Sequence, residues 1–274
     1  MRDEPSATAR FVAEHIVLLG PRIHALLEVP PEQIEWTGRV LEASGWKRGV
    51  LSSLRSTLVE RFSIPGIRTH YVLRKKIIER EVRQAIDEGC RQVVIVGAGF
   101  DVLSFRLAAE FPLVAFKELD HPATQGAKRV VAERYRSKIE FIAADLRNAT
   151  IDVAMDREKK TALVIEGVLM YFSEEQVISI LQSVRRAAKG GRLIITAMHS
   201  DRFAGSTWLA AWWLKRRGEP FRSALAPDAA VAFLSRVGFH VLRIHGAAEI
   251  RAALPAQAAG RRVASGEFIV VAEW

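Results

Sequence analysis

Acidic side chains recur at the ends of apolar runs between residues 92 and 166. Each run is rich in Val, Ile, Leu or Phe, as expected for a buried strand of a parallel sheet. The acids that close these runs are Asp101, Asp120, Asp145 and Glu166. The carboxyl ends of parallel strands share one edge of a sheet, where open α/β folds bind their ligands, so we expect these acids at one crevice. For any single acid, capping of the following helix is the alternative role.

The first run, 92–96, leads into a turn that contains Gly97 and Gly99. Glycine lets the backbone turn sharply and approach a bound molecule closely. A dinucleotide fingerprint G-x-G-x-x-G would need a third glycine where this chain has Val102. A nicotinamide cofactor needs one acid for a ribose, and several acids would repel its pyrophosphate. S-adenosylmethionine (SAM) has no phosphate and offers a ribose diol, an amino group, an ammonium and a sulfonium, so the acid-rich crevice predicts SAM.

Four segments in order resemble the leucine carboxyl methyltransferase family: QVVIVGAGFD, SFRLA, ELDHPATQGAKR and EGVLMYFSEEQV. The resemblance covers residues 65–200, and the segment SATARFVAEH shows a weaker similarity. That family includes a protein-phosphatase methyltransferase, a tRNA methyltransferase and bacterial enzymes that methylate polyketides or other small molecules. Many members have Asp-Thr-Arg after the glycine turn. Here Asp101 precedes Val102 and Leu103, so any contact of that arginine is absent, whereas Arg106 is retained.

The resemblance implies cofactor-binding roles at positions that also suit the chemistry of SAM. The expected cofactor-binding residues are Arg74, Gly97, Gly99, Asp120, Asp145, Leu146, Glu166 and Gly167. We expect Asp120 to bind the ribose hydroxyls, Asp145 and the N–H of Leu146 to bind the adenine edge, and the other residues to lie around the methionine part. Arg74 matches an arginine that the family associates with the SAM carboxylate, and guanidinium binds carboxylates bidentately. Asp101 either joins this site or holds the turn.

The acceptor side is less defined by the sequence. Methyl transfer from a sulfonium is an in-line displacement that depends on positioning. A carboxylate acceptor is already ionised at neutral pH, whereas a hydroxyl needs a base, and the sequence shows no clear nucleophile–base pair, which slightly favours a carboxylate. We expect His199 and Tyr171 as the candidate catalytic residues, and Arg68 and Trp208 beside them at the substrate. His121 is expected to be structural.

We therefore predict a SAM-dependent O-methyltransferase that acts on a carboxylate or hydroxyl of a small molecule and releases S-adenosylhomocysteine (SAH). The alternatives are an RNA- or protein-directed methyltransferase of the same family, a nicotinamide-dependent oxidoreductase, and a non-catalytic SAM-binding protein. The net charge is +9, and residues 47–83 contain ten Lys or Arg against three Glu. This excess indicates either a solvated helical face or capture of an acidic substrate. Nucleic acid is a minor alternative, because no aromatic residues interleave the basic ones.

The elements that must position these residues form one domain over 1–274. We expect a Rossmann-like class I methyltransferase fold with a mostly parallel seven-stranded sheet: a helical cap over 1–88, the SAM-binding core over 89–198, a helical acceptor-covering insertion over 199–224, and the last strands over 225–274. Helices are expected over 72–86 and after Ser173, where Gln176 completes a capping box. Isolated histidines and one cysteine predict no metal site. The polar start and short apolar stretches predict a cytoplasmic protein without membrane attachment, and the oligomeric state is not predicted.

Overall fold

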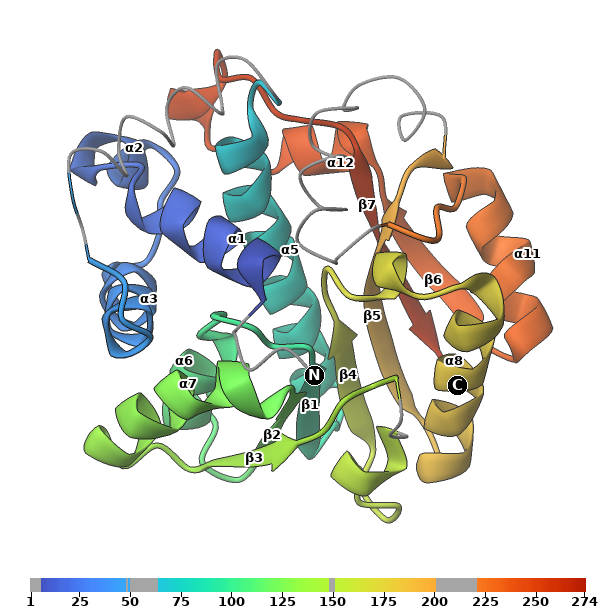
Figure 1. The fold of residues 1–274 in the computed structure, drawn as a ribbon. Helices are drawn as coiled ribbons and strands as arrows, with labels where there is room; N and C mark the ends of the chain where they lie inside the picture. Colours follow the sequence, from blue (N-terminus) through green and yellow to red (C-terminus); the bar gives the residue numbers. More distant parts are fainter. Residues whose placement is uncertain (1–5, 48, 50–63, 148–150, 201–220) are drawn as a thin grey trace.

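The computed structural model describes residues 6–47, 49, 64–147, 151–200 and 221–274. Its centre is a seven-stranded sheet with the order β3-β2-β1-β4-β5-β7-β6 (Figure 1). The strands are β1 (Gln92–Val96), β2 (Ala115–Asp120), β3 (Ile139–Ala143), β4 (Thr161–Ile165), β5 (Gly191–Met198), β6 (His240–His245) and β7 (Glu267–Glu273). Strands β1 to β5 are parallel, and β7 is antiparallel to both of its neighbours. The predicted mostly parallel seven-stranded sheet is confirmed.

Strands β1 and β4 lie at the centre of the sheet, which explains their continuous apolar sequences. Every residue of both strands is buried. From β1 the chain continues to β2 and β3 on one side, then crosses to β4 on the other side. The strand order therefore reverses between β1 and β4, and this is the point at which such sheets bind ligands.

Helices cover both faces of the sheet, because alternate side chains of each strand point to opposite faces. Val93 and Ile95 of β1 face a core built with α5 (Ile67–Asp87), α6 (Leu103–Glu110) and α12 (Ala247–Ala252). Val94 and Val96 face a core built with η1 (Ile151–Ala154), α8 (Glu174–Ala187) and α11 (Pro227–Val237). The predicted capping box of Ser173 and Gln176 begins α8. The remaining elements of this part are α7 (Pro122–Arg134), η2 (Leu169–Tyr171) and η3 (Ala256–Ala258).

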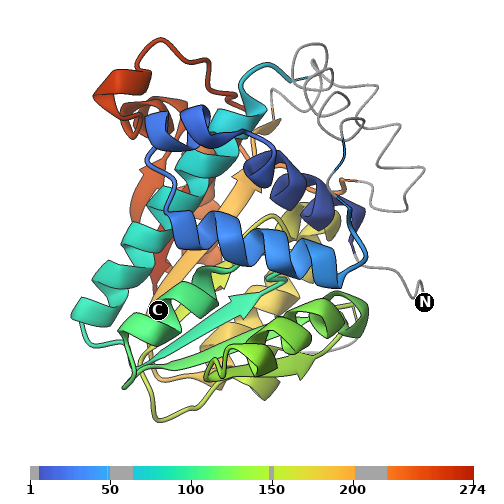
Figure 2. The ribbon, with the colours of Figure 1, turned by 90° about the vertical axis from the view of Figure 1, so that its left-hand side faces the viewer.

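Three helices from the start of the chain lie against one side of these layers (Figures 1 and 2). They are α1 (Ala7–Val17), α2 (Pro21–Leu26) and α3 (Pro31–Ala43). Helix α1 contacts α3 and α5, and α3 contacts α7. The Ser6 hydroxyl accepts a hydrogen bond from the Ala9 N–H, which fixes the start of α1. This start lies close to the glycine turn after β1.

Two element boundaries differ from the predicted ones. Helix α5 begins at Ile67 rather than at residue 72, because its first turns contain the buried polar residues Arg68, Thr69 and His70, which interrupt the apolar periodicity. The apolar run that ends at Asp120 starts at Leu113 in the sequence and predicts a strand from there, but strand β2 begins at Ala115 and Leu113 is 90% exposed. Most of the predicted insertion over 199–224, including Trp208, lies outside the described residues.

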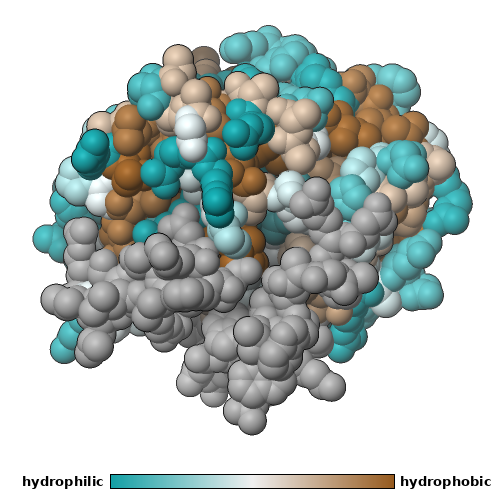
Figure 3. All heavy atoms as spheres, turned by 90° about the horizontal axis from the view of Figure 1, so that it is seen from above, coloured by the Kyte–Doolittle hydropathy of each residue, from teal (hydrophilic) through white to brown (hydrophobic). Residues whose placement is uncertain are grey.

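Among the helices in the described ranges, none has both the length and the apolar character needed to cross a membrane. Seen from above, the described surface carries hydrophilic and hydrophobic residues side by side (Figure 3). The position of a small-molecule site therefore has to be found from cavities rather than from an apolar face.

Candidate active site

A cavity of about 1140 Å³ opens at the carboxyl ends of β1, β2 and β4. This volume exceeds the roughly 300–1,000 Å³ of most small-molecule pockets, so it can hold more than one small molecule. Its described walls come from the strand-end loops, from α1, and from residues 170–172 and 221–222. Nine sequence-predicted residues line it: Arg74, Gly97, Gly99, Asp120, Asp145, Leu146, Glu166, Gly167 and Tyr171.

The glycine turn after β1 is closely packed on its protein side. Gly97 has a φ of +65°, and a Cβ added there would lie 2.3 Å from a methyl carbon of Val168. Gly99 has a φ of +53°, and an added Cβ would lie 2.8 Å from the Cβ of Ala9 in α1. Both positions therefore require glycine for conformation and for space. The contact with Ala9 also places α1 directly on the turn.

Asp120 at the end of β2 holds this turn. Its Oδ2 accepts a hydrogen bond of 2.5 Å from the Gly99 N–H, and its Oδ1 accepts one of 2.6 Å from the His121 N–H. Burial raises the pKa of Asp120 above its ordinary value. His121 itself is the N-cap of α7, where Nδ1 accepts from the Ala123 N–H. This cap gives His121 a structural role of the kind the sequence indicates.

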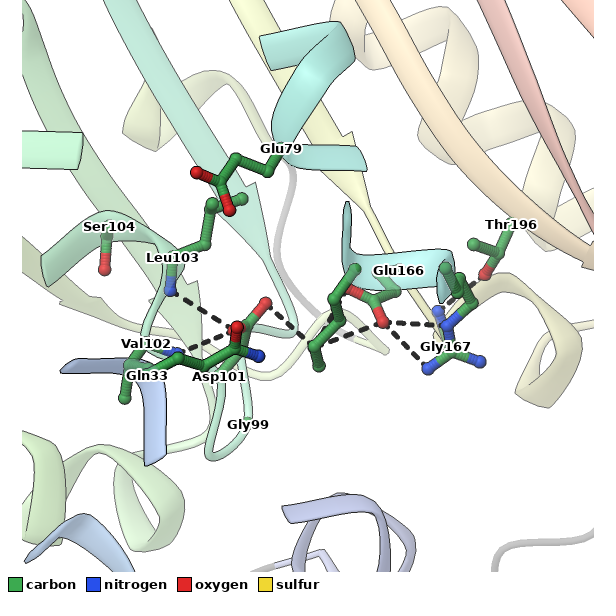
Figure 4. Close-up of polar contacts among 12 residues, drawn as sticks. Gln33, Glu79, Gly99, Asp101, Val102, Leu103, Ser104, Glu166, Gly167 and Thr196 are labelled. Carbon is green, nitrogen blue, oxygen red and sulfur yellow. Dashed lines mark hydrogen bonds and ion pairs between the residues drawn. The ribbon is translucent and has the colours of Figure 1, made fainter. Parts of the chain in front are cut away.

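A chain of alternating charges crosses the cavity wall from α6 to β7. The Lys75 Nζ lies 3.0 Å from Oδ2 of Asp101 and 3.2 Å from both carboxylate oxygens of Glu166 (Figure 4). Arg74 contacts Glu166 through Nε at 2.9 Å and Nη2 at 2.8 Å. Its Nη1 donates to Oε2 of Glu267. The Asp101 Oδ1 meanwhile accepts hydrogen bonds from the N–H groups of residues 102 and 103, so Asp101 holds the start of α6.

This row of ion pairs corrects one interpretation of the excess of Lys and Arg over residues 47–83. A solvated helical face is wrong for three described cations of α5, because Arg68 and Arg74 are buried and the Lys75 side chain is only 12% exposed. Burial lowers the pKa of Lys75, but the charges of Asp101 and Glu166 outweigh burial and raise it overall. Arg74 and Lys75 are thus permanent cations, and they neutralise the acids of the cavity wall rather than contacting solvent.

Glu267 and Lys75 line the cavity but were not expected from the sequence. Glu267 begins β7, and β7 pairs antiparallel with β5 so that Glu267 lies beside Met198. In an antiparallel strand the first residue, not the last, lies at the carboxyl edge of the parallel strands. The pattern of acids that follow apolar runs therefore does not include Glu267, which precedes its run. Lys75 was missed because its carboxylate partners lie 26 and 91 residues away in the sequence.

Asp145 follows β3, and its carboxylate binds Arg147 through contacts of 2.9 and 2.7 Å. The Arg147 side chain is 63% exposed, so this ion pair costs little to open. The Gly167 N–H donates to the Thr196 hydroxyl at 2.8 Å, as drawn in Figure 4. Gly167 lines the cavity, and a Cβ added there would meet no atom of the described residues within 4 Å.

The residues that were expected to contact the methyl acceptor do not all line the same cavity. Tyr171 lines the cavity, and its ring centroid lies 5.6 Å from that of Phe221. Arg68 is buried and does not line the cavity formed by the described residues. His199 forms a β-bridge with Leu225, and its N–H donates to the Gly266 carbonyl; it does not line the cavity formed by the described residues. Trp208 lies outside the described residues.

The cavity wall is close to electrically balanced despite the net charge of +9. Its described residues include six carboxylates and five Lys or Arg side chains. A second cavity of about 560 Å³, lined mostly by apolar residues of α8, α11 and β5, shares Met170 and Arg222 with the first. Within the described residues no group of three or more His, Cys, Asp or Glu side chains could hold a metal ion.

The seven-stranded sheet with its antiparallel last strand has the fold of the class I SAM-dependent methyltransferases, which the solved magnesium protoporphyrin IX methyltransferase of Synechocystis shares at a TM-score of 0.52 and 16% identity, covering 88% of this chain and 94% of that one. The chain belongs to the leucine carboxyl methyltransferase family, whose sequence profile matches residues 32–185. A candidate SAM-dependent methyltransferase of Streptomyces avermitilis is 29% identical over 272 residues, which cover 90% of this chain and 89% of that protein. The protein is thus a SAM-dependent methyltransferase, and its cofactor is SAM.

Other similarities are more partial. A candidate SAM-dependent methyltransferase of Streptomyces coelicolor is 32% identical over 134 residues, which span only 46% of this chain and 47% of that protein. Among solved structures, a duf574 family protein of Streptomyces avermitilis is similar with a TM-score of 0.61 and 16% identity, covering 86% of this chain and 95% of that one. At this identity the similarity establishes the fold alone.

Proposed function

We propose that this protein transfers the methyl group of SAM to an oxygen atom of a small molecule. The observation that carries the proposal is one large cavity whose lining has two kinds of residue. Acids at the ends of β2, β3 and β4 form one kind, and Tyr171, Phe221 and neighbouring apolar side chains form the other. SAM, when bound, supplies a methyl group on a sulfonium that is open to in-line displacement.

The acids and glycines of this lining fit SAM in charge and in shape. Asp120 would bind the ribose hydroxyls with the remaining lone pairs of its carboxylate. Asp145 and the N–H of Leu146 would bind the adenine edge, after Arg147 turns toward solvent. Gly97, Gly99 and Gly167 would let the backbone approach the methionine part, and the open space beside Gly167 supports this arrangement.

Arg74 retains the capacity to bind the SAM carboxylate, although it already contacts two acids. Guanidinium has five N–H donors. Three contacts of Arg74 go to Glu166 and Glu267, through Nε, Nη2 and Nη1. Two donors therefore remain for a bound carboxylate, and Glu166 remains near enough to receive the neighbouring ammonium group.

The balanced charge of the cavity favours a small molecule over RNA as the acceptor. Nucleic acid would need a basic surface to offset its phosphates. In the described cavity wall, Arg74, Lys75 and Arg147 are already paired with carboxylates. We further propose that the N-terminal helices cover the acceptor, and that the enzyme acts in the cytoplasm.

Calorimetric titration followed by transfer of a labelled methyl group tests the proposed function. SAM and SAH should bind with 1:1 stoichiometry, and NAD should not bind. The labelled product formed from a library of small hydroxyl and carboxyl compounds should contain an O–CH₃ group by mass spectrometry and NMR. Label recovered on nitrogen, on carbon or on added RNA would contradict the proposal.

A further inference from the structure

Glu267 lies at the same edge of the sheet as the acids that follow β2, β3 and β4. Along this edge the strand order runs β3-β2-β1-β4-β5-β7. The acids proposed to contact the adenine, ribose and methionine parts follow β3, β2 and β4 in turn. Glu267 begins β7, two strands beyond β4, and it still lines the same cavity. It therefore lies two strands from Glu166 along this edge, on the side away from the acids that follow β2 and β3.

The Glu267 carboxylate is anchored through one oxygen and open at the other. Its Oε2 accepts a hydrogen bond from Arg74 Nη1 and lies 3.2 Å from Nε2 of His70. Among the described residues, no donor contacts Oε1. The side chain is 15% exposed, at the cavity. The anchored oxygen fixes the carboxylate, so the other oxygen is held in position to accept a hydrogen bond from a bound molecule.

This carboxylate is ionised at neutral pH. Burial raises the pKa of Glu267, but the charge of Arg74 and the contact with His70 outweigh burial and lower it to about 2. A negative oxygen repels an acceptor carboxylate and attracts an acceptor hydroxyl. Arg68, the cation expected to hold an acceptor carboxylate, does not line the described cavity.

We propose that Oε1 of Glu267 binds the acceptor through a hydroxyl group and receives its proton, so that the acceptor is an alcohol or a phenol. This inference rests on the proposed function and narrows it. The acceptor oxygen forms a bond to the methyl carbon, and the carbon–sulfur bond breaks with its electron pair passing to sulfur. The hydroxyl proton passes to Oε1 and then to water. A weakly basic carboxylate suffices, because a hydroxyl becomes strongly acidic as its oxygen gains a third bond.

Three variants separate this role from the anchoring of Arg74. Glu267→Gln removes the charge. Glu267→Asp keeps a charge beside Arg74, but its side chain is one carbon shorter, so the free oxygen no longer reaches the same position. Glu273→Gln is the matched control, because Glu273 ends the same strand and is exposed beside His240. Turnover with a hydroxyl acceptor should fall roughly 100-fold or more in both Glu267 variants, as for a lost general base. The Kd for SAM, measured by calorimetry, should change far less, and Glu273→Gln should behave as the wild type.

Matched pairs of compounds identify the acceptor group. The pairs are phenol and benzoate, 2-naphthol and 2-naphthoate, cyclohexanol and cyclohexanecarboxylate, and decan-1-ol and decanoate. Each is incubated with the wild-type protein and SAM carrying a ¹⁴C-labelled methyl group. Binding of each compound to the SAH complex is followed in parallel by ligand-observed NMR. Transfer to hydroxyl members, with weaker NMR binding of those members in Glu267→Gln, is the expected result.

Three results would overturn the inference while leaving the proposed function intact, provided that SAM binds. These are preferred transfer to the carboxylate members, hydroxyl transfer that is unchanged in both Glu267 variants, and the absence of transfer to every hydroxyl member. Carboxylate transfer that is lost in Arg222→Leu would assign the acceptor to that cation instead. Failure of SAM to bind at all would reject the proposed function itself.

Discussion

Before any ligand binds, both carboxylate oxygens of Asp120 accept hydrogen bonds from backbone N–H groups, those of Gly99 and His121. We predict that Asp120→Asn weakens SAM binding by about 1.5–3 kcal/mol, the cost of a lost charge-assisted contact to the ribose. The amide keeps one oxygen for the Gly99 N–H, so the turn and the fold should persist. Calorimetry with SAM and circular dichroism measure the two effects.

Glu140→Gln is a suitable control for this change, since Glu140 lies on the neighbouring strand β3 with its side chain 59% exposed beside Lys117. It should leave SAM affinity unchanged. An unaltered Kd in correctly folded Asp120→Asn would exclude this acid from the cofactor site.

Individual site residues differ in how far the sequence could predict them. The acids after β2, β3 and β4 were predicted to share a crevice because parallel strands end at one edge, and all of them line the cavity. Glu267 was not predicted, since its position depends on the antiparallel direction of β7. His199 was expected at the substrate because it follows β5, but it does not line the cavity formed by the described residues. Strand direction and local hydrogen bonds are not visible in an apolar pattern.

Helix α5 is fastened to β6 by one buried acid. Glu81, which is 2% exposed, contacts Arg243 at 2.6 Å and His245 at 3.0 Å. We predict that Glu81→Gln lowers the free energy of unfolding at pH 7 by about 3 kcal/mol, because the Arg243 guanidinium loses its buried carboxylate partner and the contact with His245 is weakened. Urea unfolding measures this loss. The same change at Glu35, an exposed ion-pair residue of α3, should cost less than about 1 kcal/mol.

The effect of Glu81 should depend on pH in a defined direction. Burial raises the pKa of this acid, but hydrogen bonds from His245 and Arg243 outweigh burial and lower it from 4.5 to about 2. A lowered pKa means that stabilisation is present above 4.5 and is lost as the pH falls toward about 2. The difference in unfolding free energy between wild type and Glu81→Gln should therefore be constant near neutrality and shrink below about pH 4.5. A difference that grows on acidification would contradict this account.

Helix α1 rests on the glycine turn, and a single methyl group should displace it. We predict that Gly99→Ala destabilises the protein by about 1–2 kcal/mol through the left-handed conformation alone. The added Cβ would also push Ala9 away from the cavity and weaken SAM binding. Gly126→Ala in α7 is the control, because its added Cβ meets no atom within 4 Å. Thermal unfolding and calorimetry measure both variants.

The double variant Ala9→Gly with Gly99→Ala distinguishes the two causes. Removing the Ala9 methyl group relieves the collision but not the unfavourable backbone conformation. SAM affinity should recover in part while the loss of stability remains. If SAM affinity is equally low in the single and double variants, α1 does not act through this contact.

Elements were predicted better by type than by boundary. All seven strands follow from apolar runs and their spacing, because burial on two faces requires such runs. The start of α5 was placed too late, since Arg68 and His70 are polar residues buried by distant parts of the chain. From the sequence, Arg74 and Lys75 could equally be residues of a solvated helical face. Glu166 and Glu267 contact them only in the folded state.

At the scale of the whole molecule, cofactor binding should appear as a gain in stability. A ligand at 100 times its Kd stabilises the folded state by about 2.7 kcal/mol. We predict that SAM and SAH at such concentrations raise the Tm by several degrees, as followed by differential scanning fluorimetry. NAD should not change the Tm, because several carboxylates would face its pyrophosphate. A shift with NAD equal to that with SAM would favour the nicotinamide alternative.

Strand β7 is the last strand in the sequence but an inner strand of the sheet, between β5 and β6. During synthesis, β6 is therefore made before β7, the strand with which it pairs in the described part of the chain. Until residues 267–273 follow, β5 and β6 present unpaired apolar edges, which are sites of aggregation in incomplete chains. The same seven residues include Glu267. The sheet and the side of the cavity that contains Glu267 are therefore completed at the same time. A nascent chain that stops before residue 267 contains the glycine turn and Asp120 but not the full cavity wall.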